Sequence, residues 1–220
     1  MGTIRLYKFI PEEYGIQTIL NKRIKLSHIS ELNDPFELMG IAFEDRELRA
    51  GFNFARTLIA DRWRLLCLSN KWSNPLLWSH YADNHRGLCL GFDASTTYFK
   101  PINYQSRRFR VSDFDISDAS DLTAKDIKTI IFTKFSAWRY ESEHRAIIMP
   151  HECIKKDKIE FFRFNDQFRL REVIVGASSR LTRAELNSIL ENSAHDVQLR
   201  KARPAFRTFK MVNQRSKNIW

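Results

Sequence analysis

The residues with the most potential for chemistry lie in one short stretch, residues 138–149 (WRYESEHRAIIM). Glu141 and Glu143 stand two positions apart, and an extended chain places side chains at that spacing on one face. Two carboxylates in one cleft raise the pKa of at least one of them, unless an arginine such as Arg145 compensates. Such a pair can supply a general base, a general acid or an anchor for a cationic transition state. Together with Arg139, the same residues also fit a structural ladder of alternating charges.

A second stretch, residues 76–93 (LLWSHYADNHRGLCLGFD), is rich in aromatic, histidine and charged side chains and runs into an apolar segment. His80 and His85 are five positions apart, which is not the spacing of a helical zinc pair, so no metal site is predicted. Trp78 and Tyr81 suit either a hydrophobic core or a stacking surface for a ligand. The chain has no P-loop and no GxGxxG motif, which disfavours glycine-rich nucleotide binding.

Composition indicates a soluble protein with an anionic partner. The chain has 220 residues, 43% of them hydrophobic, and a net charge of +10, which favours one domain over residues 1–220 and binding to nucleic acid or another acidic macromolecule. A basic protein without such a partner is the alternative. Arg107, Arg108 and Arg110 form a basic cluster in a polar segment. We predict either that this segment is a solvated loop or that its arginines, together with Arg139, contact nucleic acid.

Three widely spaced cysteines, none in a CxxC pair, indicate reduced thiols rather than disulfides or a zinc finger. The sequence shows neither a signal peptide nor an apolar run long enough to cross a membrane. We therefore predict a cytoplasmic protein that has no membrane partner.

The order of elements predicts an α+β fold, with a single mixed or antiparallel sheet and several flanking helices. Strands are predicted at residues 4–10, 24–29, 65–69, 87–92, 146–149, 159–164, 173–176, 197–199 and 206–212, and helices at residues 11–20, 44–63, 75–82 and 122–135. A capping box at residues 182–185 (TRAE) predicts a further helix from about Arg183. Residues 33–35 (NDP) are typical of a turn.

Three blocks in this order resemble a bacterial family of unknown function, DUF2971: residues 33–37 (NDPFE), residues 77–82 (LWSHYA) followed by Gly87, and residues 138–145 (WRYESEHR). The resemblance extends from about Leu6 to Gly176, and the helix and strands of residues 180–212 complete the domain. The family implies no settled activity.

The opening of the chain is also similar to that of ADP-ribosyltransferases. These have a first strand with a polar anchor, a helix ending in a basic turn, and a second strand with a Ser-x-Ser motif, here residues 27–30 (SHIS). Glu141-Ser142-Glu143 resembles the glutamate motif of the arginine-serine-glutamate class. The resemblance implies a split sheet and NAD as the ligand.

By this resemblance, Glu143 holds the ribose and stabilises positive charge, and Glu141 orients or deprotonates the acceptor. The implied NAD-binding residues are Arg5, Lys8, Ser27, Asn33, Asp34, Trp78, His80 and Tyr81. His28 stands where the family motif has threonine.

The leading hypothesis is therefore an NAD-dependent ADP-ribosyltransferase-like enzyme acting on nucleic acid or another acidic macromolecule. The resemblance also implies a role as a bacterial toxin or phage-defence effector. The alternatives are a metal-independent nuclease and a non-catalytic nucleic-acid-binding protein. A transferase needs Glu143, Ser27 and a first-strand basic residue in one pocket. A nuclease needs a carboxylate within reach of His80 or His85. A binding module needs exposed aromatic residues beside Arg107 and Arg110, and no pocket of the kind that a transferase needs.

Overall fold

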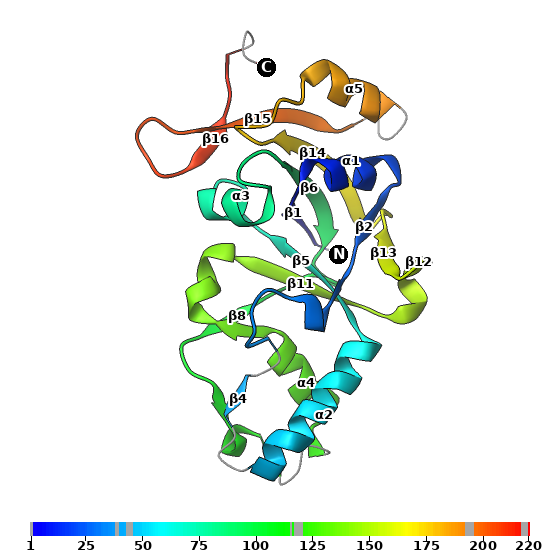
Figure 1. Ribbon diagram of the computed structural model, residues 1–220, viewed down its shortest axis with the longest axis vertical. Coiled ribbons are helices and arrows are strands. Elements are labelled where there is room, and N and C mark those ends of the chain that lie inside the picture. Colours follow the sequence, from blue (N-terminus) through cyan, green and yellow to red (C-terminus); the bar gives the residue numbers. More distant parts are fainter. Residues whose placement is uncertain are drawn as a thin grey trace.

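The computed structural model of the protein describes residues 2–37, 40–42, 46–114, 116, 121–191, 196–216 and 220. A nine-stranded sheet has the order β16-β15-β14-β6-β1-β5-β11-β7, and β3 pairs with β5 (Figure 1). Its strands are β1 (Thr3–Ile10), β3 (Ser27–His28), β5 (Arg64–Ser69), β6 (Leu88–Ser95), β7 (Lys100–Pro101), β11 (Glu143–Ile148), β14 (Phe168–Val175), β15 (Gln198–Pro204) and β16 (Met211–Asn213). Only β14 and β15 pair in parallel within this sheet.

Three smaller sheets flank the large one. They consist of β8 (Asn103–Gln105) with β10 (Thr133–Phe135); β12 (Ile154–Lys156) with β13 (Ile159–Arg163) and β2 (Arg23–Lys25); and β4 (Ile41–Ala42) with β9 (Phe109–Arg110). The predicted α+β class, with a mixed sheet and flanking helices, is confirmed.

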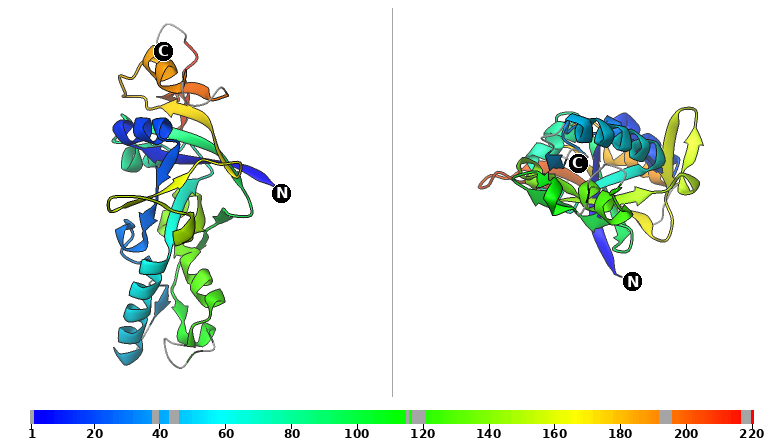
Figure 2. Two further views of the ribbon diagram at one scale, coloured as in Figure 1. Left: turned by 90° about the vertical axis from the view of Figure 1, so that its right-hand side faces the viewer. Right: turned by 90° about the horizontal axis from the view of Figure 1, so that it is seen from below.

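Apolar residues on both faces of the central strands explain the arrangement of the helices. One face of β6 packs with α1 (Glu12–Leu20) and α5 (Arg183–Glu191), whereas Cys89 and Phe9 pack on the other face with α3 (Pro75–Tyr81). A third apolar cluster joins α2 (Arg46–Arg62) and α4 (Ala124–Ile131) to β5. In Figures 1 and 2, α2 and α4 lie side by side at the end of the molecule opposite α5. No helix in the described part of the chain is both long and apolar enough to cross a membrane.

Several predicted elements were wrong in extent. The strands predicted at residues 146–149, 173–176 and 197–199 are longer than expected, since β11 begins at Glu143, β14 begins at Phe168 and β15 ends at Pro204. Residues 24–29 do not form one strand, because the buried Leu26 marks the point where the chain passes from the β13 sheet to the β5 sheet. The helix predicted to reach Phe135 ends at Ile131, because residues 133–135 pair with β8 instead. Of residues 206–212, only the last two lie in a strand, and the others form a turn.

Other predicted elements are confirmed. The structure contains β1, α1, β5 and α3 close to their predicted bounds, and the capping box of α5 is formed by Thr182 and Glu185. The predicted helix from Glu44 is present from Arg46, and Glu44 itself lies outside the described residues.

The register of the central strands aligns the site. Tyr7 of β1 pairs with Ser69 of β5, and Ser69 pairs in turn with Glu143 of β11. These three positions form one row across the sheet. The row places the Glu143 end of β11 level with Tyr7 of β1, on the two sides of β5, where the candidate site lies.

Candidate active site

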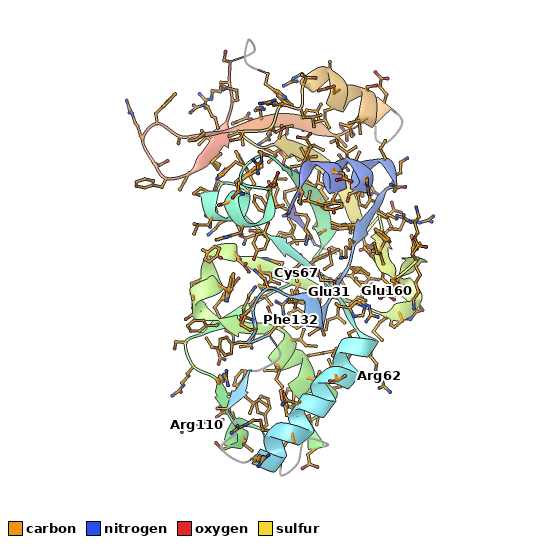
Figure 3. All side chains as sticks on the ribbon, viewed as in Figure 1. Glu31, Arg62, Cys67, Arg110, Phe132 and Glu160 are labelled. Atoms are coloured by element: carbon orange, nitrogen blue, oxygen red, sulfur yellow. The ribbon has the colours of Figure 1, made fainter. Side chains whose placement is uncertain are left out.

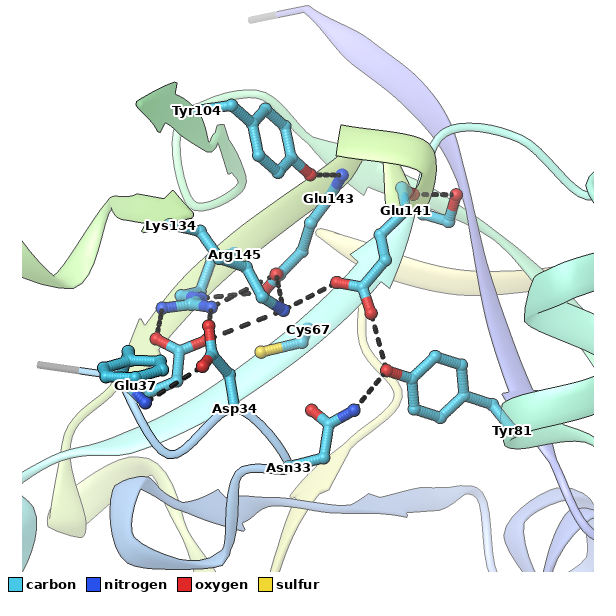
Figure 4. Close-up of polar contacts among 12 residues, drawn as sticks. Asn33, Asp34, Glu37, Cys67, Tyr81, Tyr104, Lys134, Glu141, Glu143 and Arg145 are labelled. Atoms are coloured by element: carbon cyan, nitrogen blue, oxygen red, sulfur yellow. Dashed lines mark hydrogen bonds and ion pairs between the residues drawn. The ribbon is translucent and has the colours of Figure 1, made fainter. Parts of the chain in front are cut away.

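Five charged side chains are buried together: Glu37, Lys134, Glu141, Glu143 and Arg145 (Figure 4). None of these side chains is more than 8% exposed. They come from the turn after Asp34, from β10, from the 3-10 helix η4 (Ser136–Glu141) and from β11. Burying charges is costly unless each one is paired and hydrogen-bonded, so the contacts of each side chain determine whether the cluster is stable.

Arg145 is at the centre of the cluster. Its guanidinium donates to both oxygens of Glu37, at 2.9 and 3.1 Å, and to both oxygens of Glu143, at 2.7 and 3.1 Å. It also donates to the backbone oxygen of Ile131 at 2.6 Å. Two bidentate carboxylate contacts use the planar fork that arginine provides and lysine lacks.

Lys134 connects the third carboxylate to the other two. Its ammonium lies 2.6 Å from Glu141 Oε2, 3.1 Å from Glu143 Oε2 and 3.6 Å from Glu37 Oε1. Burial opposes the charge of Lys134, but the three carboxylates outweigh burial and raise the pKa of the ammonium. Lys134 therefore remains a cation.

Glu141 carries the contacts that lead out of the cluster. Its Oε1 accepts a hydrogen bond of 2.5 Å from the Tyr81 hydroxyl, which accepts one of 2.6 Å from Asn33 Nδ2. Burial and the Glu141 carboxylate raise the pKa of the Tyr81 phenol, so the phenol keeps its proton and donates it to Glu141. Ser69 Oγ donates to the Glu141 backbone oxygen at 2.6 Å and fixes the end of η4.

The extended geometry predicted for Glu141 and Glu143 is wrong. Glu141 ends η4, Ser142 has a left-handed backbone with a φ of 46°, and Glu143 begins β11. This reversal, rather than the two-residue period of a strand, turns both carboxylates toward Lys134. The Glu143 N–H also donates to the Tyr104 hydroxyl at 2.8 Å, which holds the junction between η4 and β11.

The two neighbouring cations keep Glu143 ionised. Burial opposes its charge, but Arg145 and Lys134 lower the pKa of Glu143 to about 2. Burial raises the pKa of the neighbouring Cys67 thiol, so Cys67 is not a thiolate nucleophile. The compensation by Arg145 that the sequence left open is therefore present at Glu143.

Acid should weaken the fold through Glu143. Its pKa is lower in the folded than in the unfolded chain, so the stabilisation, about 3 kcal/mol, is present above about pH 4.5 and is lost as the pH falls toward 2. Urea unfolding of wild type and Glu143→Gln between about pH 6 and pH 3 should give a stability difference that shrinks toward low pH. A difference that does not change with pH would contradict this assignment.

A cavity of about 240 Å³ opens beside the cluster, and its walls include Tyr7, Lys8, Ser27, Tyr81, Glu141 and Glu143. The structure therefore brings the first-strand lysine, Ser27 and both glutamates into one pocket. Lys8 Nζ donates to the backbone oxygen of Cys67 at 3.3 Å, and Lys8 forms no ion pair with any described carboxylate. It is thus a cation at the cavity that is free to meet an anionic ligand.

A second cavity of about 250 Å³ lies on another side of Glu37 and Lys134, which line both cavities. Phe36 and Phe135 are 52% and 49% exposed and line this second cavity with Arg107 and Arg108. The Arg108 guanidinium lies 4.9 Å from the centre of the Phe36 ring. Exposed aromatic rings therefore lie beside Arg107 and Arg108, which is one of the two features expected of a binding module, whereas the other, the absence of the first cavity, is not met.

Several predicted binding residues lie elsewhere. Arg5 pairs with Asp93 at 2.8 Å and does not line the cavity. Trp78 is fully buried in the core, and its indole donates to Trp72 O. Asp34 is buried in the turn, where it accepts from the Phe36 N–H at 2.9 Å.

The remaining predicted residues lie at the surface. His80 is exposed near Tyr140, and neither His80 nor His85 forms an ion pair within the described ranges. Figure 3 places Arg110 near the α2 end of the molecule, away from Cys67 at the cavity. Arg139 donates to Tyr104 O at 3.2 Å.

Sequence reasoning missed Glu37 and Lys134 as members of the site. Glu37 was noted only as part of a motif, although its position directly after an Asx-type turn limits where it can point. Lys134 lies within residues 130–135 (IIFTKF). A lone charge in such an apolar run is a signal of a buried pair.

A family model described as "Protein of unknown function (DUF2971)" matches residues 77–146. No curated protein and no solved structure matches the chain. The matched segment contains most of α3, all of β6, and Lys134, Glu141, Glu143 and Arg145, but not Glu37, Lys8 or Ser27. The chain is therefore similar to this family over the segment that supplies four of the five clustered charges.

Proposed function

We propose that the protein is an ADP-ribosyltransferase-like enzyme that uses NAD as a substrate and transfers ADP-ribose to an acidic macromolecule such as nucleic acid. The observation that carries the proposal is the cavity in which Lys8, Ser27, Glu141 and Glu143 meet. The transferase hypothesis requires Glu143, Ser27 and a basic residue of the first strand in one pocket, and Lys8 is that basic residue.

The charge of the cluster suits this chemistry. Three carboxylates face two cations, Lys134 and Arg145, which leaves a formal charge of minus one beside the cavity. Cleavage of the nicotinamide–ribose bond develops positive charge at the ribose. Fixed negative charge at a site that excludes water stabilises such charge without reorganisation.

Each residue has a defined role in the proposal. Glu143, held by Arg145, accepts a hydrogen bond from a ribose hydroxyl and faces the developing cation. Nicotinamide leaves with the electrons of the broken bond, the acceptor nucleophile forms the new bond to the same ribose carbon, and Glu141 takes the proton of the acceptor. Of the two implied NAD-binding residues of the first strand, Arg5 and Lys8, only Lys8 lines the cavity, and it binds phosphate.

The size of the neighbouring space supports a ligand as long as a dinucleotide. A neighbouring cavity of about 540 Å³ shares Lys8, Phe9, Ser27 and Glu31 with the first one. A ligand that is too long for the first cavity can extend into the second past the ammonium of Lys8. Ligand sites of this kind usually measure about 300–1,000 Å³.

A second candidate function is nucleic-acid binding without catalysis. It is favoured by the exposed rings of Phe36 and Phe135 beside Arg107 and Arg108. In an enzyme, the same surface would hold the acceptor.

The test is incubation of the purified protein with NAD labelled on the adenylate, together with DNA, RNA and cell lysate. Release of nicotinamide and transfer of label are expected. Lys8→Ala should raise the KM for NAD roughly 10- to 100-fold, with a smaller change in kcat, because a charge-assisted hydrogen bond to phosphate is lost.

Lys156→Ala is the matched control, because Lys156 is an exposed lysine on a hairpin outside the cavities. Folded protein that releases no nicotinamide with any acceptor would refute the enzyme. Oligonucleotide binding in the same preparation would then favour the second candidate.

A further inference from the structure

Two phenylalanines stand in full contact with solvent at the tip of a hairpin. The hairpin joins β15 to β16 through residues 205–210 (AFRTFK) and projects from the edge of the molecule (Figure 1). Phe206 is 92% exposed and Phe209 is 100% exposed. Exposing two large apolar side chains together gains nothing for folding, so their presence indicates an interaction.

The hairpin is held in place by hydrogen bonds at its base. The Ala205 N–H donates to Lys210 O at 2.9 Å and closes the turn. The buried Met211 donates its N–H to Ser73 O at 2.8 Å, which fixes the hairpin to the chain before α3. The two rings are therefore presented by an anchored turn.

The charge around the rings is of one sign. Residues 198–216 contain six lysines and arginines and no acidic residue. Arg203, Arg207 and Lys210 surround the tip, and none of them pairs with a carboxylate of the described chain. The Arg203 guanidinium lies 4.6 Å from the centre of the Phe206 ring.

We propose that this hairpin binds single-stranded nucleic acid, with bases stacked on Phe206 and Phe209 and phosphates paired with Arg207 and Lys210. Base stacking on exposed aromatic rings beside free cations is the way proteins bind single strands without sequence preference. The Arg203 stack favours this partner over a lipid surface. A base can cover the free face of Phe206 while Arg203 stays on the other, whereas insertion into acyl chains would desolvate the guanidinium.

The surface is separate from the candidate active site. β16 is at one edge of the nine-stranded sheet, whereas β11, which carries Glu143, is next to the opposite edge. The inference therefore goes beyond the proposed function and does not require NAD. If the acceptor is nucleic acid, the hairpin is a second contact that recruits the strand.

The test is fluorescence anisotropy of the full chain with labelled single strands of about 16 nucleotides, oligo(dT) and oligo(U). The double variant Phe206→Ala/Phe209→Ala should raise the Kd at least roughly tenfold for one or both strands. Arg207→Ala/Lys210→Ala should also weaken binding and reduce the slope of log Kd against log salt by about one to two. Both variants alter exposed side chains only, so wild-type circular dichroism is expected.

Matched controls separate this site from general charge attraction. Tyr98→Ala removes an exposed aromatic ring elsewhere, and Lys156→Ala/Lys158→Ala removes two charges from another hairpin. Both should bind close to wild type. Equal losses in hairpin and control variants would overturn the proposal. The proposal would also be overturned if the hairpin variants lost binding to vesicles of anionic lipid but bound oligonucleotides like the wild type. The same holds if the protein were a dimer that Phe206→Ala/Phe209→Ala dissociates without changing the Kd for oligonucleotides.

Discussion

Replacing Arg145 by methionine is expected to lower the free energy of unfolding by about 3–5 kcal/mol, the cost of leaving buried charges unpaired. Arg145 is completely buried and donates to both oxygens of Glu37 and of Glu143. Methionine keeps much of the volume but supplies no donors, so two carboxylates would keep only Lys134 as a cationic partner. Urea unfolding at neutral pH measures the change.

The control for this variant is Arg108→Met, which removes an exposed arginine and should change stability by less than about 0.5 kcal/mol. Arg145→Lys should recover only part of the loss, because one ammonium cannot make two bidentate contacts. A change below about 1 kcal/mol in Arg145→Met would show that the buried network is not held by this side chain.

Glu143→Gln is expected to reduce the rate of nicotinamide release roughly 10²–10³-fold, the usual cost of removing one preorganised electrostatic contact to a transition state. The amide keeps the size of the carboxylate but removes the negative charge that faces the ribose. Steady-state assays with saturating NAD give the change in kcat. Unfolding curves show whether the variant remains folded during the assay.

Glu141→Gln distinguishes the two carboxylates. If Glu141 deprotonates the acceptor, Glu141→Gln should lose most of the transfer of label to the acceptor. It should lose less of the nicotinamide release that occurs when water takes the place of the acceptor. Equal effects of both variants on both steps would contradict the separate roles. Full activity of a folded Glu143→Gln protein would remove Glu143 from the chemistry.

Local patterns in the sequence predicted the elements whose formation depends on neighbours in the chain. Alternating apolar residues located β1, proline and the acids of the first turn located α1, and the Thr182–Glu185 capping box located α5. Predictions failed where a distant segment decided the outcome. Residues 133–135 have helical neighbours, yet they form a strand because β8 offers parallel pairing.

In the candidate site, too, local patterns in the sequence predicted some residues, whereas contacts between distant segments decided others. The acidic motif drew attention to Glu141 and Glu143, because their types and spacing are visible in the sequence. Glu37 was not found, because its contact with Arg145 spans 108 positions. Lys134 is only seven positions from Glu141, but it lies in an apolar segment that was predicted as helix, so its contact with the glutamates was not expected. The left-handed Ser142 was also hidden, since no glycine marks it.

The long separation between these partners has a kinetic consequence. β1 pairs with β6, joining Thr3 to Ser95, and β11 pairs with β5, joining Glu143 to Ser69. Proteins dominated by such non-local pairing fold slowly, because large loops must close before any contact compensates the lost entropy. Glu37 and Arg145 meet only after the central strands are aligned, so in refolding experiments the pocket should appear in the last phase, together with native sheet.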